Sequence, residues 1–177
     1  MASKQLLRPS EALNRRFFRA ETQSEDDEQQ SGGVTRRLGF RLGGLGFLLD
    51  EHAISELADF GNICAVPNTA SWLLGLINLR GNLVPVFDIV RALDLPTPNE
   101  KKRMLLILGQ GEEAAGLLID ELPAHQFFSQ EEKLESLPAM PDAIKSYILS
   151  AYQKEDALWF DFDHSGYLAS LTSKVAV

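Results

Sequence analysis

Apolar residues come in short runs through most of this chain, and glycine or proline interrupts them before a long helix could form. Two pairs of runs carry the pattern: "RLGFRL" and "LGFLL" flank Gly43-Gly44, and "RMLLIL" and "AGLLID" flank "GQGEEA". Glycine permits the positive φ that tight turns need, so each pair predicts a β-hairpin. With little room for crossover helices, the sequence predicts a mainly β fold, an antiparallel barrel or sandwich.

The segment between the two hairpins contains shorter elements. Residues 51–61, "EHAISELADFG", fit a short helix or an irregular edge segment, and "NICAVPN" fits a short strand that ends at Pro67. We expect strands at 76–79 and 83–88 around a turn at Gly81-Asn82. Their apolar residues run on without alternating, which predicts strands buried on both faces.

Two further elements close the chain. "ALWFDFD" alternates Leu158, Phe160 and Phe162 with Trp159 and Asp161, as a half-exposed strand would. The last residues, "HSGYLASLTSKVAV", fit a closing helix.

Charge divides the chain into two parts. Residues 1–36 combine a candidate short helix, "PSEALNRRFFRA", with a polar acidic linker, "ETQSEDDEQQSGG". We expect them to be an N-terminal extension, and residues 37–177 to be a single domain. The whole net charge of −8 lies in the second part, because the acidic and basic residues of the first part balance. An acidic domain repels phosphate backbones and anionic lipid, which argues against nucleic acid or a membrane surface as the main partner.

Residues that could perform chemistry are few and scattered. His52, His125 and His164 lack partners at metal-ligand spacing, and Cys64 lies in the apolar stretch "ICAV", where we expect it to pack as a small core group. No nucleophile, base and oxyanion donor occur together, and no phosphate-binding loop is present. We therefore expect no enzyme, no cofactor and no metal. One cysteine and no signal peptide or long apolar span predict a cytoplasmic protein without membrane insertion.

Arg80 is the unusual residue of the apolar stretch "SWLLGLINLRGNLVPVFDIV". A guanidinium there either extends to solvent from a strand face or pairs with a carboxylate. From the residues alone the candidate partners are Glu51, Glu56 and Asp88.

The stretch "VPNTASWLLGLINLRGNLVPVFDI", residues 66–89, resembles the CheW family of signalling adaptors. The ordered features are the Val66-Pro67-Asn68 turn, Gly75, the "INLRG" segment that contains Arg80, the Val84-Pro85 pair and Asp88. The similarity extends over residues 38 to about 172. It implies a CheW-like fold of two small five-stranded SH3-like β-barrels that share an apolar core, with a few short helices.

What the resemblance implies about function follows from the same positions. Family members are non-catalytic adaptors that couple the cytoplasmic tip of a chemoreceptor (a methyl-accepting chemotaxis protein) to the regulatory domain of a CheA-type histidine kinase. Ile54 and Glu56 match a pair that borders the receptor-binding groove, and Gly75 and Arg80 match motif positions beside it. His125 falls where an apolar groove residue is common. The resemblance therefore predicts that Arg80 pairs with Glu56, and it leaves the kinase-binding residues unidentified.

A finer resemblance concerns the branch of the family. The N-terminal extension, Trp72 in "ASWLLG", the "AGLLIDEL" strand and the "VAV" ending resemble the PilI type, which serves type IV pili in twitching motility. The chain would then act in the cytoplasm at membrane-associated receptor arrays. Two alternatives stay open: a flagellar chemotaxis adaptor, and a small-molecule-binding β-barrel, which would need an enclosed pocket lined by aromatic side chains with a few polar groups.

Overall fold

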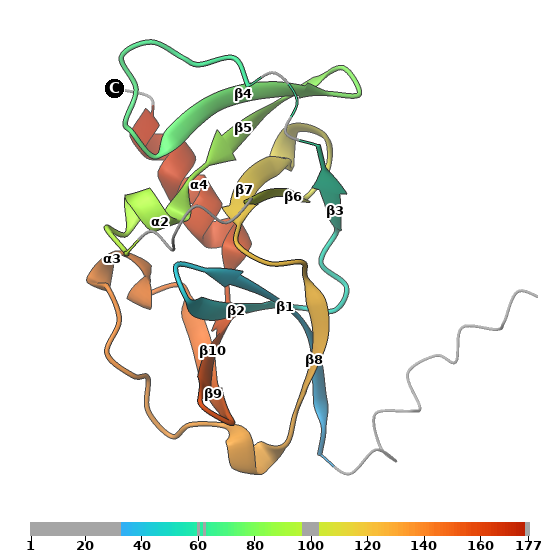
Figure 1. Cartoon of the computed structure of the whole chain (residues 1–177), viewed down its shortest axis with the longest axis vertical. Coiled ribbons are helices and arrows are strands. Elements are labelled where there is room, and N and C mark those ends of the chain that lie inside the picture. The colour runs from blue at the N-terminus through green and yellow to red at the C-terminus, as the bar shows by residue number, and fades with distance from the viewer. Residues whose placement is uncertain (1–32, 60, 62, 97–102, 176–177) are drawn as a thin grey trace, which may run out of the picture. The chain divides into compact units, whose positions relative to one another are not determined.

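The described part of the chain folds into two five-stranded β-sheets with a few short helices (Figure 1). The structure is a computed structural model that describes residues 33–59, 61, 63–96 and 103–175. The expected N-terminal helix and linker lie outside these residues, as does most of the loop after Pro96. The first strand begins at Thr35, two residues before the expected start of the domain.

Sheet A has the strand order β8-β1-β2-β10-β9. Its strands are β1 (Thr35–Leu42), β2 (Leu45–Leu49), β8 (Ala124–Phe128), β9 (Ile148–Lys154) and β10 (Ala157–Phe162). The β1–β2 hairpin forms as predicted, and Gly43 and Gly44 occupy its turn with φ of 57° and 83°. Phe40 and Leu42 are buried together on one face of β1.

Sheet B has the strand order β3-β6-β7-β5-β4. Its strands are β3 (Ser55–Ala58), β4 (Leu73–Leu79), β5 (Asn82–Phe87), β6 (Met104–Leu108) and β7 (Ala115–Ile119). The predicted β6–β7 hairpin is confirmed, with a short 3-10 turn, η2 (Gly111–Glu113), between its strands.

The two sheets share one pattern of pairing, in which an antiparallel group of three strands is joined to an antiparallel pair by one parallel pairing. β2 pairs in parallel with β10, and β5 pairs in parallel with β7. The prediction of an antiparallel barrel or sandwich was therefore wrong for these two pairings, whereas the mainly β fold is confirmed. The parallel pairs join strands far apart in sequence, and short-range turn signals carry no information about them.

Each sheet curls until its two edge strands approach one another. In sheet A, Phe128 of β8 and Tyr152 of β9 place their ring centroids 4.7 Å apart, and Lys154 Nζ donates to the Phe127 carbonyl at 2.9 Å. These rings join Leu48 and Trp159 in a small cluster. Sheet B encloses a similar cluster of aliphatic side chains, including Val84, Val86 and Ile107. Side chains thus fill the interiors of two small barrels.

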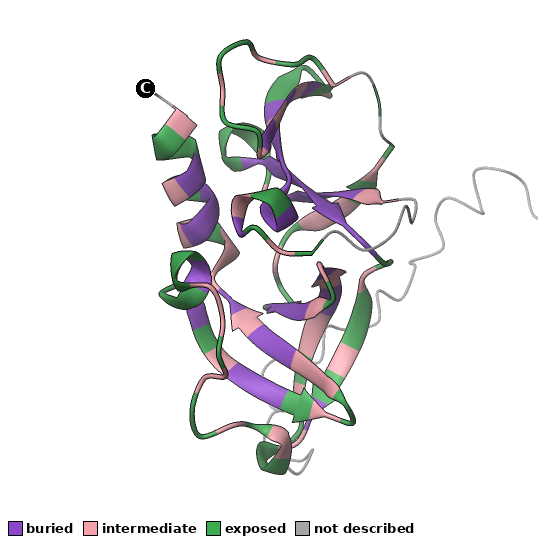
Figure 2. Ribbon diagram, turned by 60° about the vertical axis from the view of Figure 1, so that its left-hand side comes forward, coloured by how far each residue is buried: buried purple, intermediate pink, exposed green. Residues whose placement is uncertain are grey.

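A larger apolar core lies between the sheets and takes residues from both. Phe47 and Phe160 of sheet A and Phe87 and Leu117 of sheet B belong to it. Tyr167, Leu168 and Leu171 of the last helix, α4 (His164–Val175), belong to it as well. Figure 2 shows buried residues along both sheets and along one side of α4. The expected shared core and closing helix are both confirmed.

The remaining helices are short. They are α2 (Ile89–Ala92), α3 (Asp142–Lys145) and the 3-10 turn η3 (Gln130–Glu132). Ser129 and Glu132 form a reciprocal capping box at the start of η3. None of the helices in the described residues is both long and apolar enough to cross a bilayer.

Several local predictions for sheet B were wrong. Of the two alternatives for the segment around Ile54, the helix was wrong: Ser55–Ala58 form edge strand β3 directly after Ile54. Cys64 is exposed, because it makes only an isolated bridge with Leu76 at the edge of β4. β4 alternates buried and less buried residues, and Leu83 at the start of β5 is 70% exposed, so these strands are not buried on both faces.

Candidate functional site

A cleft of about 160 Å³ opens at one end of sheet B, where three segments meet. The segments are the start of β3, the β4–β5 hairpin turn and the β6–β7 loop. The lining residues are Ile54, Ser55, Glu56, Leu79, Arg80, Asn82, Val84, Gly109, Gln110, Gly111 and Ala114. Three of the five residues that the family resemblance assigns to the receptor groove, namely Ile54, Glu56 and Arg80, are therefore together.

Arg80 occupies the β4–β5 turn, one residue earlier than the predicted turn at Gly81-Asn82. Arg80 and Gly81 both have positive φ, 52° and 91°, as a two-residue type I′ hairpin turn requires. The Asn78 side chain accepts a hydrogen bond from the Gly81 N–H at 2.9 Å and supports the turn. The turn projects Arg80 out of the apolar strands, and 76% of its side chain is exposed. Its charge is consequently not buried.

The Arg80 side chain pairs with Glu56, as predicted. Arg80 Nη2 donates to Glu56 Oε2 at 2.7 Å. β3 and β4 are the two edge strands of sheet B, so this ion pair joins the open edges of the curled sheet. The other two candidate carboxylates have different partners: Glu51 contacts Arg36 and His52, and Asp88 contacts Arg91 and Arg103.

Apolar side chains flank the ion pair, one directly before β3 and one on it. Ile54 is 53% exposed and Leu57 is 49% exposed. The Ile54 carbonyl accepts a hydrogen bond from the Gly109 N–H at 2.9 Å, which ties the start of β3 to the β6–β7 loop. Sequence reasoning missed Leu57 as a surface residue, because the segment also fitted a helix, in which it would pair with Ile54. An edge strand next to a charged rim is a surface suited to binding another protein.

Gly75 lies away from the cleft and has a backbone role in β4. Its φ is 143°, and a Cβ at this position would meet the carbonyl oxygen of Cys64, with the Cys64 carbonyl carbon at 2.7 Å. Only glycine therefore lets residues 63 and 64 approach the strand that ends next to Arg80.

His125 lies on a different sheet from the cleft. It belongs to β8, pairs with Leu38 of β1 and accepts a hydrogen bond at Nε2 from Arg36 Nη2 at 3.1 Å. This bond requires an unprotonated Nε2, because a guanidinium can only donate. The structure does not bring His125 to the cleft formed by Ile54, Glu56 and Arg80.

The residues that line the cleft are better suited to binding than to catalysis. Its charged groups are one carboxylate and one guanidinium, already paired, and its only hydroxyl is that of Ser55. Within the described residues, no three His, Cys, Asp or Glu side chains gather as a metal site would require.

A second hollow, of about 370 Å³, bears on the small-molecule alternative. Its walls come from β4 and β5, from the end of α4 and from the segment before β4: Val66, Leu73, Leu76, Pro85, Phe87, Thr172 and Val175. Among these lining residues, only Phe87 is aromatic and only Thr172 has a polar side chain. The convergent polar groups that a specific ligand site needs are not found on the walls of this hollow.

Comparison with known proteins identifies the fold and its relatives. A family model described as CheW-like domain matches residues 36–171. The chain is 28% identical over 138 residues to protein PilI of Pseudomonas aeruginosa, covering 74% of this chain and 77% of that protein, which supports the PilI-type branch. It is 29% identical over 89 residues to a probable chemotaxis protein CheW of Rhizobium etli, covering 50% of this chain and 57% of that protein.

A solved structure agrees with the same fold. The crystal structure of the scaffolding protein TtCheW from Thermoanaerobacter tengcongensis superimposes with a TM-score of 0.62 at 18% identity. The match covers 77% of this chain and 88% of that one. Two five-stranded sheets with a shared core are thus the fold of a CheW scaffold.

Proposed function

The chain belongs to the CheW-like domain family of scaffold proteins in chemosensory signalling, and from this premise we propose that it couples a chemoreceptor to a CheA-type histidine kinase. CheW family members join receptors to such kinases and are non-catalytic. In this proposal residues 37–177 are the adaptor domain and residues 1–36 an extension. The protein acts in the cytoplasm and is recruited to receptor arrays at the membrane.

The observation that carries the proposal is the Arg80–Glu56 pair beside exposed apolar side chains at the edge of sheet B. The helical tip of a receptor presents apolar side chains with polar neighbours, and exposed Ile54 offers an apolar contact of matching character beside Glu56 in the cleft. The ion pair next to Ile54 holds the β4–β5 turn against β3. The pair thus shapes the receptor-binding edge, and its contribution to stability, about 0 to 1 kcal/mol, is secondary.

We assign Gly75 and His125 supporting positions around this edge. Gly75 sets the path of β4 and thereby the position of Arg80. His125, with Arg36, lies on the β1–β8 ribbon of sheet A, so that any receptor contact it makes is separate from the cleft. The kinase regulatory domain is proposed to bind elsewhere on the domain.

The pathway we propose is that of type IV pili and twitching motility. The match to PilI spans three quarters of both chains, whereas the match to the Rhizobium etli chemotaxis protein spans half of this chain. This difference in coverage favours a pilus-type adaptor over a flagellar one.

A charge exchange at the ion pair tests the receptor-binding role. Glu56→Arg and Arg80→Glu should each weaken binding of the purified protein to a receptor cytoplasmic fragment, because each places two like charges side by side. The double variant should recover most of the affinity, since the pair is restored in reverse. Glu135→Arg, at an exposed position away from the cleft, is the matched control and should bind normally.

Binding of the same variants to the kinase distinguishes a specific loss of receptor binding from general damage to the protein. Binding to the C-terminal regulatory domain of the kinase should be unchanged in all four variants. If the double variant binds receptor no better than the single ones, the pairing has no role in recognition. If the unmodified protein binds neither partner at tens of micromolar, roughly the weak end of signalling interfaces, the adaptor assignment is wrong.

A further inference from the structure

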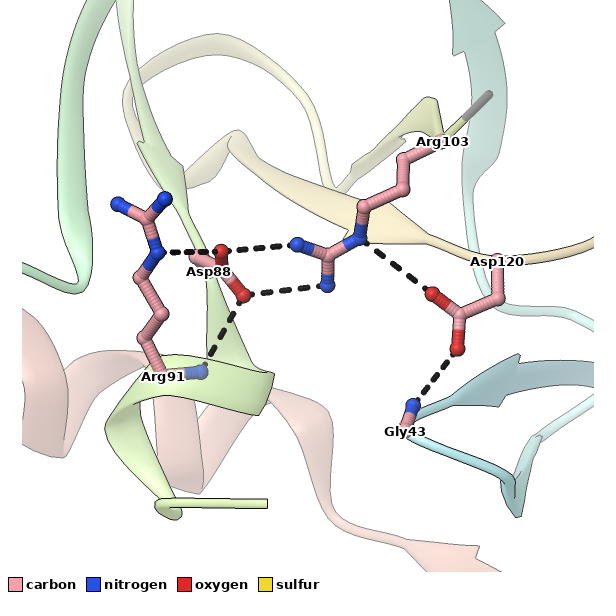
Figure 3. A network of polar contacts seen from close by, with 5 residues as sticks. All are labelled: Gly43, Asp88, Arg91, Arg103 and Asp120. Carbon is pink, nitrogen blue, oxygen red and sulfur yellow. Dashed lines mark hydrogen bonds and ion pairs between the residues drawn. The ribbon is translucent and has the colours of Figure 1, made fainter. Parts of the chain in front are cut away.

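Arg103 directly precedes β6 of sheet B and lies between two buried aspartates, Asp88 and Asp120 (Figure 3). Its Nη1 donates to Asp88 Oδ2 at 2.8 Å and its Nη2 to Asp88 Oδ1 at 3.1 Å, a bidentate pair. Asp88 is 1% exposed. Its Oδ1 also accepts a hydrogen bond from the backbone N–H of Arg91, and its Oδ2 forms an ion pair with Arg91 Nε. Asp88, at the end of β5, is therefore fully engaged.

Asp120 connects the same arginine to the other sheet. It follows β7 of sheet B, and its Oδ2 accepts a hydrogen bond at 2.7 Å from the N–H of Gly43, in the β1–β2 turn of sheet A. The Asp120 N–H also donates to the Arg41 carbonyl at 2.9 Å. Two hydrogen bonds from one residue thus fasten the end of β7 to the hairpin of the opposite sheet.

The contact between Arg103 and Asp120 is incomplete. Arg103 Nε and Asp120 Oδ1 are 3.4 Å apart, within ion-pair distance. Both atoms are buried, and neither makes a hydrogen bond to any described residue. A buried donor and a buried acceptor that face one another unbonded are costly, and a small turn of the Asp120 side chain, which the Gly43 bond now holds, would join them.

We propose that Arg103 and Asp120 form a latch with two positions between the sheets. In the position seen here Asp120 bonds Gly43 and only approaches Arg103. In the other, a slight shift between the sheets lengthens the bond from the Gly43 N–H to Asp120 Oδ2, and the released carboxylate turns to complete the hydrogen bond between its Oδ1 and Arg103 Nε. The Asp88 carboxylate holds the guanidinium of Arg103 in place in both positions. The movement is therefore confined to the contact between Asp120 and the β1–β2 turn.

The β6–β7 hairpin connects this latch to the cleft. Arg103 directly precedes β6 and Asp120 directly follows β7, so both lie at the open end of the hairpin. Gly109 and Ala114, at its turn end, line the cleft. The hairpin strands between them are almost completely buried, and a closely packed hairpin transmits displacement from one end to the other. Occupation of the cleft would therefore move the latch. This inference does not depend on which molecule occupies the cleft.

Hydrogen exchange at the Gly43 amide measures the position of the latch, because this amide is bonded to Asp120 in only one of the two positions. In Arg103→Met no cation competes with Gly43 for Asp120, so the Gly43 hydrogen bond stays closed and hydrogen exchange at this amide should slow by about tenfold or more. Arg91→Met is the matched control: it removes an arginine from the same Asp88 but leaves the link between the sheets intact, so Gly43 exchange should stay within about twofold of the unmodified protein. Equal exchange in the two variants would overturn the latch.

A milder variant covers the case in which Arg103→Met does not fold. Arg103→Lys keeps a cation but cannot engage both aspartates with one planar fork. It should alter Gly43 exchange in the same direction by a smaller factor, and an unchanged rate would equally overturn the proposal.

Coupling to the cleft is tested by NMR of the full-length protein. Glu56→Gln weakens the ion pair and should shift the amide resonances of Gly43 and Asp120, whereas Glu135→Gln should not. In the Arg103→Lys background the Glu56→Gln shifts at Gly43 should shrink, because the latch is weakened. Shifts of equal size in both backgrounds, or no shift at Gly43 in either, would contradict transmission through the latch.

Discussion

Arg80 combines an ion pair to Glu56, with Nη2 and Oε2 2.7 Å apart, with a left-handed backbone conformation at φ 52°. The two features conflict, since a left-handed conformation disfavours any side chain with a Cβ and favours glycine or asparagine. A turn sequence of Asn-Gly would suit the backbone better than the Arg-Gly that is present. The arginine is therefore held at a local cost in stability, which fits a residue that serves recognition.

Substitutions of Arg80 should separate stability from binding. Arg80→Ala loses the ion pair and keeps the backbone strain, whereas Arg80→Asn loses the pair and relieves part of the strain. We expect the Asn variant to be more stable than the Ala variant by about 1 kcal/mol in urea unfolding, with equally weakened receptor binding. Equal stability of the two variants would show that the turn is not strained.

Gly75 should be among the positions of β4 least tolerant of substitution. In Gly75→Ala the new Cβ meets the Cys64 carbonyl at a φ of 143°, and we expect a loss of more than about 2 kcal/mol in unfolding free energy. Gly81→Ala is the control, because its φ is also positive, 91°, but no atom lies within 4 Å of the added Cβ. It should lose only about 1 kcal/mol. Urea titration of both variants checks the difference, and similar losses would mean that the contact with Cys64 is soft.

Local signals were sufficient for the hairpins and the last helix, and insufficient for elements that depend on distant partners. The β1–β2 hairpin is specified by Gly43-Gly44 and its flanking apolar residues. β3 has only four residues, and its strand conformation comes from pairing with β6, about fifty positions later, so that its sequence also fitted a helix. The parallel partner of β2 could not be read from the sequence for the same reason.

The candidate site shows the same division. Residue patterns left Arg80 with three candidate carboxylates, and only the family resemblance selected Glu56. The resemblance also assigns His125 to the receptor-binding groove; in the structure it lies on sheet A next to Arg36, and its part in binding stays a prediction. Arg103 gave no signal, since it follows two lysines in a polar loop and its carboxylates come from the ends of two other strands.

His164 should make stability depend on pH near neutrality. It begins α4, and burial lowers its pKa from the ordinary value of 6.5, although Asp163 acts in the opposite direction. As pH falls below 6.5, the unfolded chain takes up a proton that the folded protein resists, so stability decreases until the pH reaches the lowered pKa of the folded state.

Replacement of His164 tests this pH dependence. In His164→Gln, the decrease in the urea midpoint between about pH 7 and about pH 5.5 should be smaller than in the unmodified protein, because the titrating group is gone. Far-UV circular dichroism during urea titration gives both midpoints. An identical decrease in both proteins would assign the pH dependence to other groups.

Ile54 provides the final test of where the receptor binds, because its side chain is exposed and its removal should leave the fold intact. Ile54→Ser should change the free energy of unfolding by no more than about 0.5 kcal/mol, as is usual for surface substitutions. Receptor binding should fall by about tenfold or more, since a central apolar contact of the interface is lost. Leu149→Ser is the control: Leu149 is 70% exposed on β9 of sheet A, so its substitution also removes an exposed apolar side chain, but away from the cleft. Equal weakening by both substitutions, measured by titration calorimetry with a receptor fragment, would mean that binding follows general surface hydrophobicity and that the edge of sheet B has no special role.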